Sequence, residues 1–343
     1  MRESLKMSPD REHPAGVFVY DPLDYPVDAL LERNVRVTLG ASLRSPGVSR
    51  PKFPADELVR AARGHEVLLG ASGALITREV MEGIGTLRMI AKLGIGYEVV
   101  DVEAATSLGI VVTNTPVHGE IGPVAEHAIA LMLAAAKRLD WYHKEYLAKG
   151  GWKDPEHMSY LLSGSTVGIV GLGHIGRAVA VRLAGWDCRL LGCDPAVGDG
   201  PPGVEMVDLG ILLRESDVVT LHAPGGPPGA GPLLTSERIA SMKDTAILVN
   251  TARGNLVDEN AIAEALQHGT LGAAALDVYA PEPPPAGAAI LSAPNVVLTP
   301  HMAAWSPSIR KEMVEMAFGD ILRFLDEGRA THVVNPEVLA ARP

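Results

Sequence analysis

The sequence predicts an α/β fold with two parallel-sheet domains. Three observations support this prediction. Short apolar runs alternate with helical stretches along most of the chain, which is typical of parallel sheets. A glycine-rich turn stands between two apolar runs near the middle, as in doubly wound sheets. The chain has 343 residues, 47% of them apolar, which is enough for two hydrophobic cores.

The first third of the chain predicts one α/β domain. Apolar runs predict strands, and stretches with apolar residues at helical spacing predict helices between them. The predicted strands are Val17–Tyr20, Val35–Thr38, Val67–Leu69, Met89–Lys92 and Ile110–Thr113. The predicted helices are Ala55–Arg63, Arg78–Gly83 and Val102–Leu108.

The middle of the chain predicts a long helix, from Val124 to about Tyr146, with an apolar stripe that includes Leu131 and Ala135. A polar segment, Lys149 to Ser163, then leads to the glycine-rich turn.

The second half predicts a doubly wound sheet that begins at the strand Val167–Val170 and continues with an apolar run ending at Asp194. Further predicted strands are Val218–His222, Ala246–Asn250, Ala273–Asp277 and Val296–Leu298. Predicted helices are centred near Leu209–Leu213, Ser236–Ser241 and Asn260–Gln267, and a last one covers Ser306 to Leu325. The Pro- and Gly-rich insert Ala223–Pro232 is either a connector or a loop beside a ligand.

The stretch GIVGLGHIGR indicates a dinucleotide site of the Rossmann type. Gly171 permits a tight turn, Gly173 lets the backbone approach a pyrophosphate, and Gly176 lets helix and strand pack closely. The helix that follows presents free N–H groups to an anion. Asp194 ends the second strand, where a carboxylate accepts hydrogen bonds from a ribose and repels a 2′-phosphate. The sequence therefore predicts NAD rather than NADP.

Composition excludes several other classes of protein. The formal net charge of −11 argues against a nucleic-acid surface. The longest apolar stretch, Ile121 to Ala136, contains Pro123 and Glu126 and is too short to span a bilayer. The polar N-terminus has no signal-peptide pattern. Cys188 and Cys193 form no metal motif and are expected to be reduced. We expect a cytoplasmic protein without membrane, nucleic-acid or metal partners.

Three residues beyond the glycine motif are candidates for chemistry. Arg253, Glu282 and His301 each follow a predicted strand of the same sheet. The carboxyl edge of a parallel sheet is where α/β proteins bind ligands, so these side chains are expected beside the dinucleotide. Singly, each also fits an ordinary structural role: a surface charge, a solvated turn residue, and a helix cap.

Several motifs in order resemble one known family. They are LGIGYEVVDVEAATSLGIVVTNTP, VAEHAIALML, GIVGLGHIG, NTARGNLVDE, AALDVYAPEPP and TPHMAAWS. Together they resemble the D-isomer-specific 2-hydroxyacid dehydrogenases, a family that includes phosphoglycerate dehydrogenases and hydroxypyruvate and glyoxylate reductases. The resemblance extends from about Val67 to the C-terminus.

The resemblance implies roles for the candidate residues. His301 would be the general acid/base, and Glu282 would orient its ring and favour the imidazolium. Arg253 would hold the substrate's carboxylate and carbonyl oxygens. Ile95 and Gly96 would add backbone N–H groups to the carboxylate site. The implied cofactor contacts are Gly171, Gly173, His174, Ile175, Gly176, Asp194, His222, Ala223, Pro224, Thr251, Ala252, Arg253, Asp277, His301 and Ala304.

The resemblance also implies an architecture. A Rossmann NAD domain, residues 118–302, would be inserted into a flavodoxin-like substrate domain made of residues 1–117 and 303–343. The active site would lie in the cleft between them. The helix that begins at Val124 and the segment around Trp152 resemble the family's dimerisation elements, so a homodimer is expected. For that helix, the alternative is that it only covers the sheet.

The expected reaction is NAD-dependent interconversion of a 2-keto acid and a D-2-hydroxy acid. No positive charge stands between Gly70 and Thr77, where phosphoglycerate-specific relatives carry an Arg. The expected substrate is therefore small and unphosphorylated, such as glyoxylate, hydroxypyruvate or pyruvate. Two alternatives remain open: a non-enzymatic NAD-sensing interaction protein on the same fold, and a phosphite-type dehydrogenase.

Overall fold

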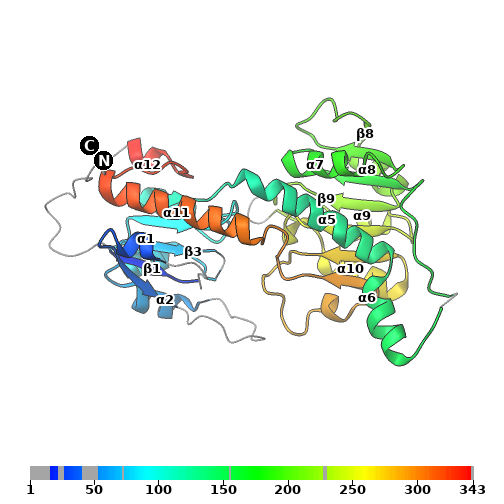
Figure 1. Ribbon diagram of the computed structural model, residues 1–343, viewed down its shortest axis with the longest axis horizontal. Coiled ribbons are helices and arrows are strands. Elements are labelled where there is room, and N and C mark those ends of the chain that lie inside the picture. Colours follow the sequence, from blue (N-terminus) through cyan, green and yellow to red (C-terminus); the bar gives the residue numbers. More distant parts are fainter. Residues whose placement is uncertain are drawn as a thin grey trace. The chain divides into compact units, whose positions relative to one another are not determined.

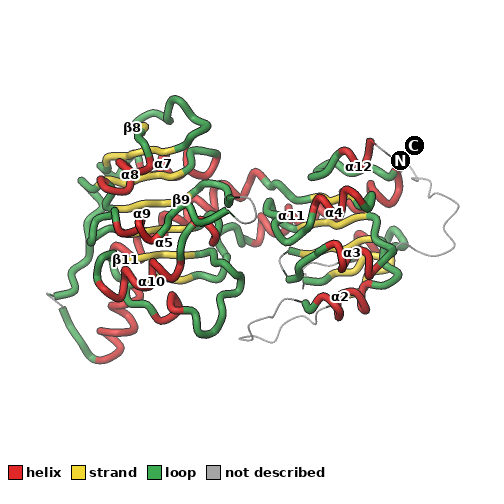
Figure 2. Tube along the Cα trace, turned by 180° about the vertical axis from the view of Figure 1, so that it is seen from behind, coloured by secondary structure: helices red, strands yellow, loops and turns green. Residues whose placement is uncertain are grey.

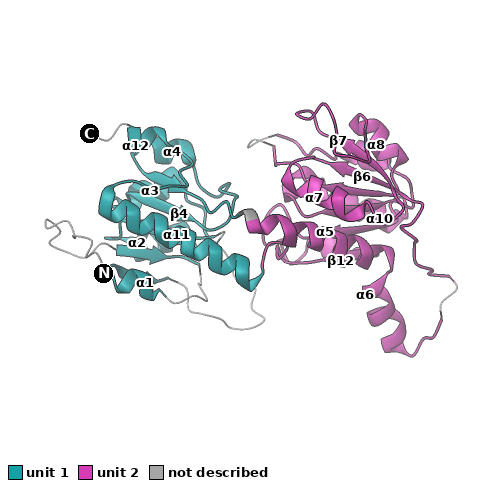
Figure 3. Cartoon of the chain, turned by 45° about the horizontal axis from the view of Figure 1, so that its top comes forward, with its two compact units in different colours: residues 1–118, 306–343 teal, residues 119–305 magenta. Residues whose placement is uncertain are grey.

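The structure, a computed structural model, describes residues 16–21, 27–40, 53–71, 73–153, 156–226 and 230–340. The chain divides into two compact units, coloured separately in Figure 3. Unit 1 consists of Met1–His118 and Ser306–Pro343, and unit 2 is Gly119–Trp305. Unit 2 is thus an insertion within unit 1. Its limits differ from the expected 118 and 302 by one residue and three residues.

Some sequence-based interpretations fall outside the described residues. These are most of the N-terminal segment (residues 1–15), Ser72 between Gly70 and Thr77, residues 154–155 of the polar segment, and residues 227–229 of the Pro/Gly insert.

Unit 1 is a parallel sheet of five strands in the order β2-β1-β3-β4-β5, which is the flavodoxin-like order. Its strands are β1 (Gly16–Val19), β2 (Arg36–Leu39), β3 (Val67–Gly70), β4 (Met89–Lys92) and β5 (Val111–Thr113). Its helices are α1 (Asp28–Leu31), α2 (Ala55–Ala62), α3 (Arg78–Ile84), α4 (Val102–Ser107), α11 (Pro307–Glu327) and α12 (Glu337–Ala340). Helices α1, α11 and α12 cover one face, and α2, α3 and α4 cover the other.

Unit 2 is a parallel sheet of seven strands in the order β12-β11-β10-β9-β6-β7-β8. Counted from β6, this is the Rossmann order with one further strand. The strands are β6 (Thr166–Val170), β7 (Arg189–Cys193), β8 (Val204–Met206), β9 (Val218–Leu221), β10 (Ile247–Asn250), β11 (Ala273–Leu276) and β12 (Val296–Leu298). Figures 1 and 2 show these strands from opposite sides.

Helices cover both faces of the unit 2 sheet. Helices α5 (Ile121–Ala136) and α7 (His174–Leu183) pack on one face. The other face carries α8 (Leu209–Glu215), α9 (Ser236–Ala240) and α10 (Glu259–His268). Strands buried on both sides explain why their sequences are continuous apolar runs. The predicted fold class, two doubly wound parallel-sheet domains, is confirmed.

The helix expected from Val124 to about Tyr146 is not continuous, because a turn at residues 137–138 interrupts it. Helix α5 ends at Ala136, and Arg138 has a left-handed backbone, with φ of 50°. The carbonyl of Ala136 accepts a hydrogen bond from the N–H of Tyr160, 2.8 Å away, so a distant segment ends the helix. A short helix, α6 (Leu139–Trp141), and a π-helical turn, Tyr142–Tyr146, follow.

The short elements α1, β8 and α12 were not predicted from the sequence. None of the helices in the described part of the chain is long and apolar enough to cross a membrane.

Candidate active site

The glycine-rich turn follows β6, and its glycines differ in what surrounds them. Gly171 has φ of 90°, and a Cβ there would lie 2.6 Å from the backbone N of Ala223. A Cβ on Gly176 would lie 2.0 Å from the carbonyl oxygen of Gly171. A Cβ on Gly173 would meet no atom of the described part of the chain within 4 Å. Gly171 and Gly176 are therefore required by the fold itself, whereas Gly173 leaves an open approach to the backbone.

Helix α7 begins directly after Gly173, and no side chain caps its N-terminus. A helix N-terminus without a side-chain cap suits an anion. Asp194, directly after β7, faces the same turn: its Oδ2 accepts a hydrogen bond from the N–H of Leu172 (2.7 Å), and its Oδ1 accepts one from Ala196 (2.9 Å). The carboxylate is half-buried and retains lone pairs for further donors.

The three candidate chemical groups lie at the carboxyl ends of adjacent parallel strands. Arg253 follows β10, Glu282 follows β11 and His301 follows β12, and β10 pairs with β11, which pairs with β12. The structure brings Glu282 and His301 into contact: Nδ1 of His301 lies 2.7 Å from Oε2 of Glu282. The second oxygen, Oε1, accepts the N–H of Tyr279 at 3.1 Å, which holds the carboxylate in place.

This contact shifts the pKa of both partners. Burial of the imidazole by the surrounding protein would by itself lower its pKa. The hydrogen bond to Glu282, with the charges of Glu282 and Asp277, outweighs this and raises the pKa above its ordinary value of 6.5. Burial would raise the pKa of Glu282, but its hydrogen bond to His301 lowers it overall. Both shifts favour the imidazolium–carboxylate form of the pair. The His301 side chain remains 51% exposed.

The side chain of Asn250 holds the backbone of the loop that carries Arg253. The buried side chain of Asn250 accepts the N–H of Ala252 (3.0 Å) and donates to the carbonyl of Arg253 (2.9 Å). A Cβ on Gly254 would lie 2.0 Å from the carbonyl carbon of Tyr279. The Arg253 loop and the loop leading to Glu282 therefore pack backbone against backbone.

One titratable group beside Arg253 was not predicted from the sequence. Glu120, just before α5, is only 7% exposed, and burial raises its pKa to about 7, while the charge of Arg253 acts to lower it. Its sequence context carried no signal, because the contact depends on a segment more than a hundred positions away.

The other predicted cofactor contacts lie along the same carboxyl edge. His174 and Ile175 begin α7; His222, Ala223 and Pro224 follow β9; Thr251 and Ala252 follow β10; Asp277 follows β11; and Ala304 follows β12. The hydroxyl of Thr251 and Nδ1 of His222 are buried without a hydrogen-bond partner among the described residues. Asp277 is fully buried and hydrogen-bonded internally, and its place beside the cofactor stays a prediction.

The predicted substrate contacts Ile95 and Gly96 belong to unit 1, in the turn after β4. Gly94 has φ of 96°, and its N–H donates to the hydroxyl of Thr115 at 2.7 Å. Ile95 is 43% exposed, and its carbonyl accepts a hydrogen bond from Asn114. The role of both residues in substrate binding stays a prediction.

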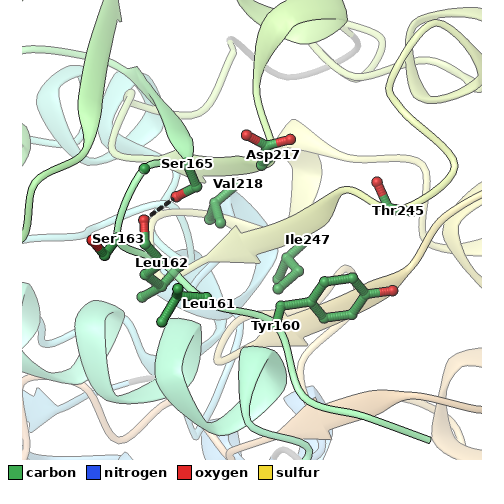
Figure 4. Close-up of a pocket in the computed structure, with 10 residues that line it drawn as sticks. Tyr160, Leu161, Leu162, Ser163, Ser165, Asp217, Val218, Thr245 and Ile247 are labelled. Carbon is green, nitrogen blue, oxygen red and sulfur yellow. Dashed lines mark hydrogen bonds between the residues drawn. The ribbon is translucent and has the colours of Figure 1, made fainter. Parts of the chain in front are cut away.

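A cavity of about 260 Å³ lies elsewhere in unit 2, as Figure 4 shows. It is lined by the segment Tyr160–Ser165 before β6, by Asp217 and Val218 at the start of β9, and by Thr245 and Ile247 at the start of β10. These are the amino ends of the strands, so the cavity opens at the edge opposite to the glycine turn and His301. Within the described ranges, no group of three or more His, Cys, Asp or Glu side chains could hold a metal ion.

Comparison with known proteins identifies the family. Residues 129–303 match the family described as "D-isomer specific 2-hydroxyacid dehydrogenase, NAD binding domain". The chain is 40% identical to a glyoxylate reductase of Korarchaeum cryptofilum over 275 residues, which are 78% of this chain and 82% of that relative. The chain belongs to the D-isomer specific 2-hydroxyacid dehydrogenase family.

Two further similarities are consistent with this assignment. A D-3-phosphoglycerate dehydrogenase of Archaeoglobus fulgidus is 40% identical over 252 residues, or 73% of this chain, but the match spans only about half (47%) of that relative. The crystal structure of the TT0316 protein from Thermus thermophilus superposes with a TM-score of 0.79 at 37% identity, covering 93% of this chain and 99% of that one. The predicted family, NAD cofactor and oxidoreductase class are confirmed.

The residues at the carboxyl edge fit NAD. The open approach at Gly173 and the uncapped α7 N-terminus suit a pyrophosphate, and Asp194 suits a ribose diol.

Proposed function

We propose that this family member reduces a small, unphosphorylated 2-keto acid to the D-2-hydroxy acid with NADH, or catalyses the reverse oxidation. The observation that carries the proposal is the Nδ1–Oε2 contact of 2.7 Å between His301 and Glu282, at the carboxyl end of the strands next to Arg253. A hydrogen-bonded carboxylate fixes the ring and leaves Nε2 as the nitrogen that can transfer a proton.

The proposed chemistry divides between the cofactor and the chain. Bound NADH supplies hydride to the carbonyl carbon of the keto acid. The carbonyl C=O bond becomes a C–O single bond, and its oxygen takes the proton from Nε2 of the His301 imidazolium. Glu282 stabilises that imidazolium before the transfer. Arg253 binds the substrate carboxylate through its planar guanidinium. The products are the D-2-hydroxy acid and NAD⁺. Neutral His301 is then reprotonated from solvent.

The substrate assignment is supported by the turn after β3 in unit 1. No Lys or Arg occurs from Gly70 to Thr77. The Asp21 carboxylate accepts hydrogen bonds from the N–H groups of Ala71 (2.5 Å) and Gly73 (3.1 Å), so the charge at this turn is negative. Such a turn disfavours a phosphate and suits an uncharged substituent, as in glyoxylate, hydroxypyruvate or pyruvate.

We also propose that the protein is a homodimer that pairs through residues 137–163. This segment exposes several large apolar side chains: Leu139 (57%), Leu147 (58%), Trp152 (77%), Met158 (70%) and Leu161 (72%). In its described part, the Trp141 ring stacks on His157 with centroids 4.4 Å apart. Many exposed apolar side chains in one segment are typical of an interface.

The direct test follows NADH absorbance over a panel of 2-keto acids that includes glyoxylate, hydroxypyruvate, pyruvate and 3-phosphohydroxypyruvate, with phosphite tested against NAD⁺. We expect turnover with an unphosphorylated keto acid, and a His301→Ala variant at least about 100-fold slower with NADH binding retained. His268→Ala, at an exposed histidine at the end of α10, is the control and should match wild type.

Several results would contradict the proposal. Unchanged turnover in His301→Ala would remove the general acid. A preference for 3-phosphohydroxypyruvate would overturn the substrate assignment. Tight NADH binding with no turnover would favour an NAD-sensing interaction protein, and turnover of phosphite alone would favour the phosphite-type reaction.

A further inference from the structure

The carboxylate of Asp277, at the end of β11, holds the backbone directly after His301. It is 0% exposed. Its Oδ1 accepts the N–H of Met302 (2.8 Å), and its Oδ2 accepts the N–H of Ala303 (2.9 Å). The backbone carbonyl of Asp277 accepts the N–H of His301 itself, also at 2.8 Å. The turn that presents His301 is therefore built around one buried carboxylate.

His301 needs such support because its backbone is in the left-handed region, with φ of 55°. A residue with a Cβ adopts this conformation mainly where its surroundings impose it. If the turn relaxed, the imidazole would move away from Glu282.

Two further residues, Thr299 and His127, complete the hydrogen-bond network of the Asp277 carboxylate. The Thr299 hydroxyl donates to Oδ1 of Asp277 at 2.5 Å. Nε2 of His127, on α5, lies 3.0 Å from the Thr299 Oγ1 and 3.5 Å from Oδ1 of Asp277. Because the Thr299 proton is used toward the carboxylate, its oxygen accepts a hydrogen bond from the His127 Nε2–H. The donors thus run in one direction, from His127 through Thr299 to Asp277.

Helix α5 is able to supply His127 because it packs against β10, β11 and β12. The face of α5 that contacts the sheet is apolar, with Ala128 and Met132 fully buried among residues of β10 and β11. His127 is the polar group of this helix that reaches the carboxyl edge of the sheet.

We propose that His127 and Thr299 are positioning residues for His301. Through their hydrogen bonds they fix the Asp277 carboxylate, which in turn holds the Thr299–Ala303 turn and aligns the imidazole with Glu282. This inference rests on the proposed function, in which His301 is the general acid/base. Neither His127 nor Thr299 contacts the reacting atoms in this scheme, so neither is a catalytic residue.

The proposal separates the effects on catalysis from those on binding. Arg253, which would hold the substrate, is on a different loop that is fixed by Asn250. Loss of the Thr299 hydroxyl should therefore lower kcat with little change in KM. The charged groups that face His301 are Glu282, Asp277 and Arg253, and the carboxylate that faces His127 is Asp277. A looser turn weakens the Glu282 contact, so the pKa of His301 should fall toward its ordinary value.

The experiment compares Thr299→Val, which removes the hydroxyl, with Thr299→Ser, which keeps it. In the holoenzyme, kcat and KM are measured from pH 5 to 10. We expect Thr299→Val to lower kcat by about 10- to 100-fold, with KM within about twofold of wild type. The high-pH limb of the reduction profile should move to lower pH. Thr299→Ser should restore both. His127→Phe should behave like Thr299→Val. The fall in kcat should be smaller in His127→Gln, because its side chain can still donate an N–H.

A second readout does not depend on turnover. Selective labelling of histidine rings gives the pKa of His301 by NMR titration, assigned with His301→Gln. A fall in the His301 pKa in Thr299→Val or His127→Phe, absent in Thr299→Ser, supports the proposal. This holds even if the wild type reduces no keto acid, because that result would count only against the proposed function. An active wild type whose kcat and His301 pKa are unchanged in Thr299→Val and His127→Phe overturns the proposal. Equal losses in Thr299→Val and Thr299→Ser overturn it as well.

Discussion

At the scale of single residues, three charged neighbours determine the protonation of His301. Glu282 contacts its Nδ1 directly, and the negative charge of Asp277 acts in the same direction. The positive charge of Arg253 acts against them. The two carboxylates prevail, and the pKa of the imidazole is raised above 6.5. The pKa of His301 is thereby raised while its side chain stays 51% exposed.

The reaction should therefore show opposite pH dependence in its two directions. Reduction requires the imidazolium, so kcat/KM for the keto acid should fall as the pH rises through the raised pKa of His301. Oxidation requires the neutral ring and should rise over the same interval. Glu282→Gln removes the carboxylate that raises this pKa, so both limbs should move to lower pH. Rates measured across pH 5 to 10 test this, with Glu264→Gln on the surface of α10 as the control. A Glu282→Gln profile that overlays wild type would contradict it.

At the scale of elements, the turn between β6 and α7 combines two requirements in a few residues. Gly171 and Gly176 are enclosed by backbone atoms of the protein itself, and the Asp194 carboxylate holds the N–H of Leu172. Each hydrogen bond to a charged group of this kind contributes about 1.5 to 3 kcal/mol. Gly173 has no such role, because none of the described residues occupies the space beside it.

This contrast predicts different outcomes for two glycine substitutions. Gly173→Ala should leave the unfolding temperature of the cofactor-free protein unchanged, yet weaken NADH binding by at least about tenfold, because the methyl group occupies the approach to the backbone. Gly176→Ala should destabilise the fold itself, since its Cβ would overlap the Gly171 carbonyl. Thermal unfolding and NADH fluorescence titration distinguish these effects. Gly185→Ala, also in open space, is the matched control. Undiminished NADH affinity in Gly173→Ala would remove this glycine from the cofactor site.

At the scale of the whole molecule, the apolar side chains exposed between residues 137 and 163 predict self-association. The double variant Met158→Glu, Leu161→Glu places two charges in this segment and should convert a dimer into monomers, because burying unpaired charges is costly. Val181→Glu, at an equally exposed valine of α7, should leave the dimer intact. Light scattering after size-exclusion chromatography measures the mass. A wild-type monomer, or a dimer that persists in the double variant, would refute this assignment.

Local patterns in the sequence predict most of the fold and part of the site. Continuous apolar runs located the major strands, since strands buried on both faces require them. The end of α5 was not predictable, because it depends on a hydrogen bond from Tyr160 to Ala136. The carboxyl-edge position of Arg253, Glu282 and His301 followed from strand order alone. Two interactions left no local signal because they join segments far apart in the chain. They are the electrostatic interaction of Glu120 with Arg253 and the hydrogen bond between His127 and Thr299.

The close packing at Gly254 has a consequence for redesign of this enzyme. There is no room for a methyl group between that glycine and the Tyr279 peptide, so a shift of one loop would also shift the other. A designer who lengthens or re-angles the Arg253 loop to admit a bulkier acid would also displace the carboxylate that orients the imidazole. Substrate range in this chain is therefore better altered outside these two loops, where a change of side chain leaves their packing undisturbed.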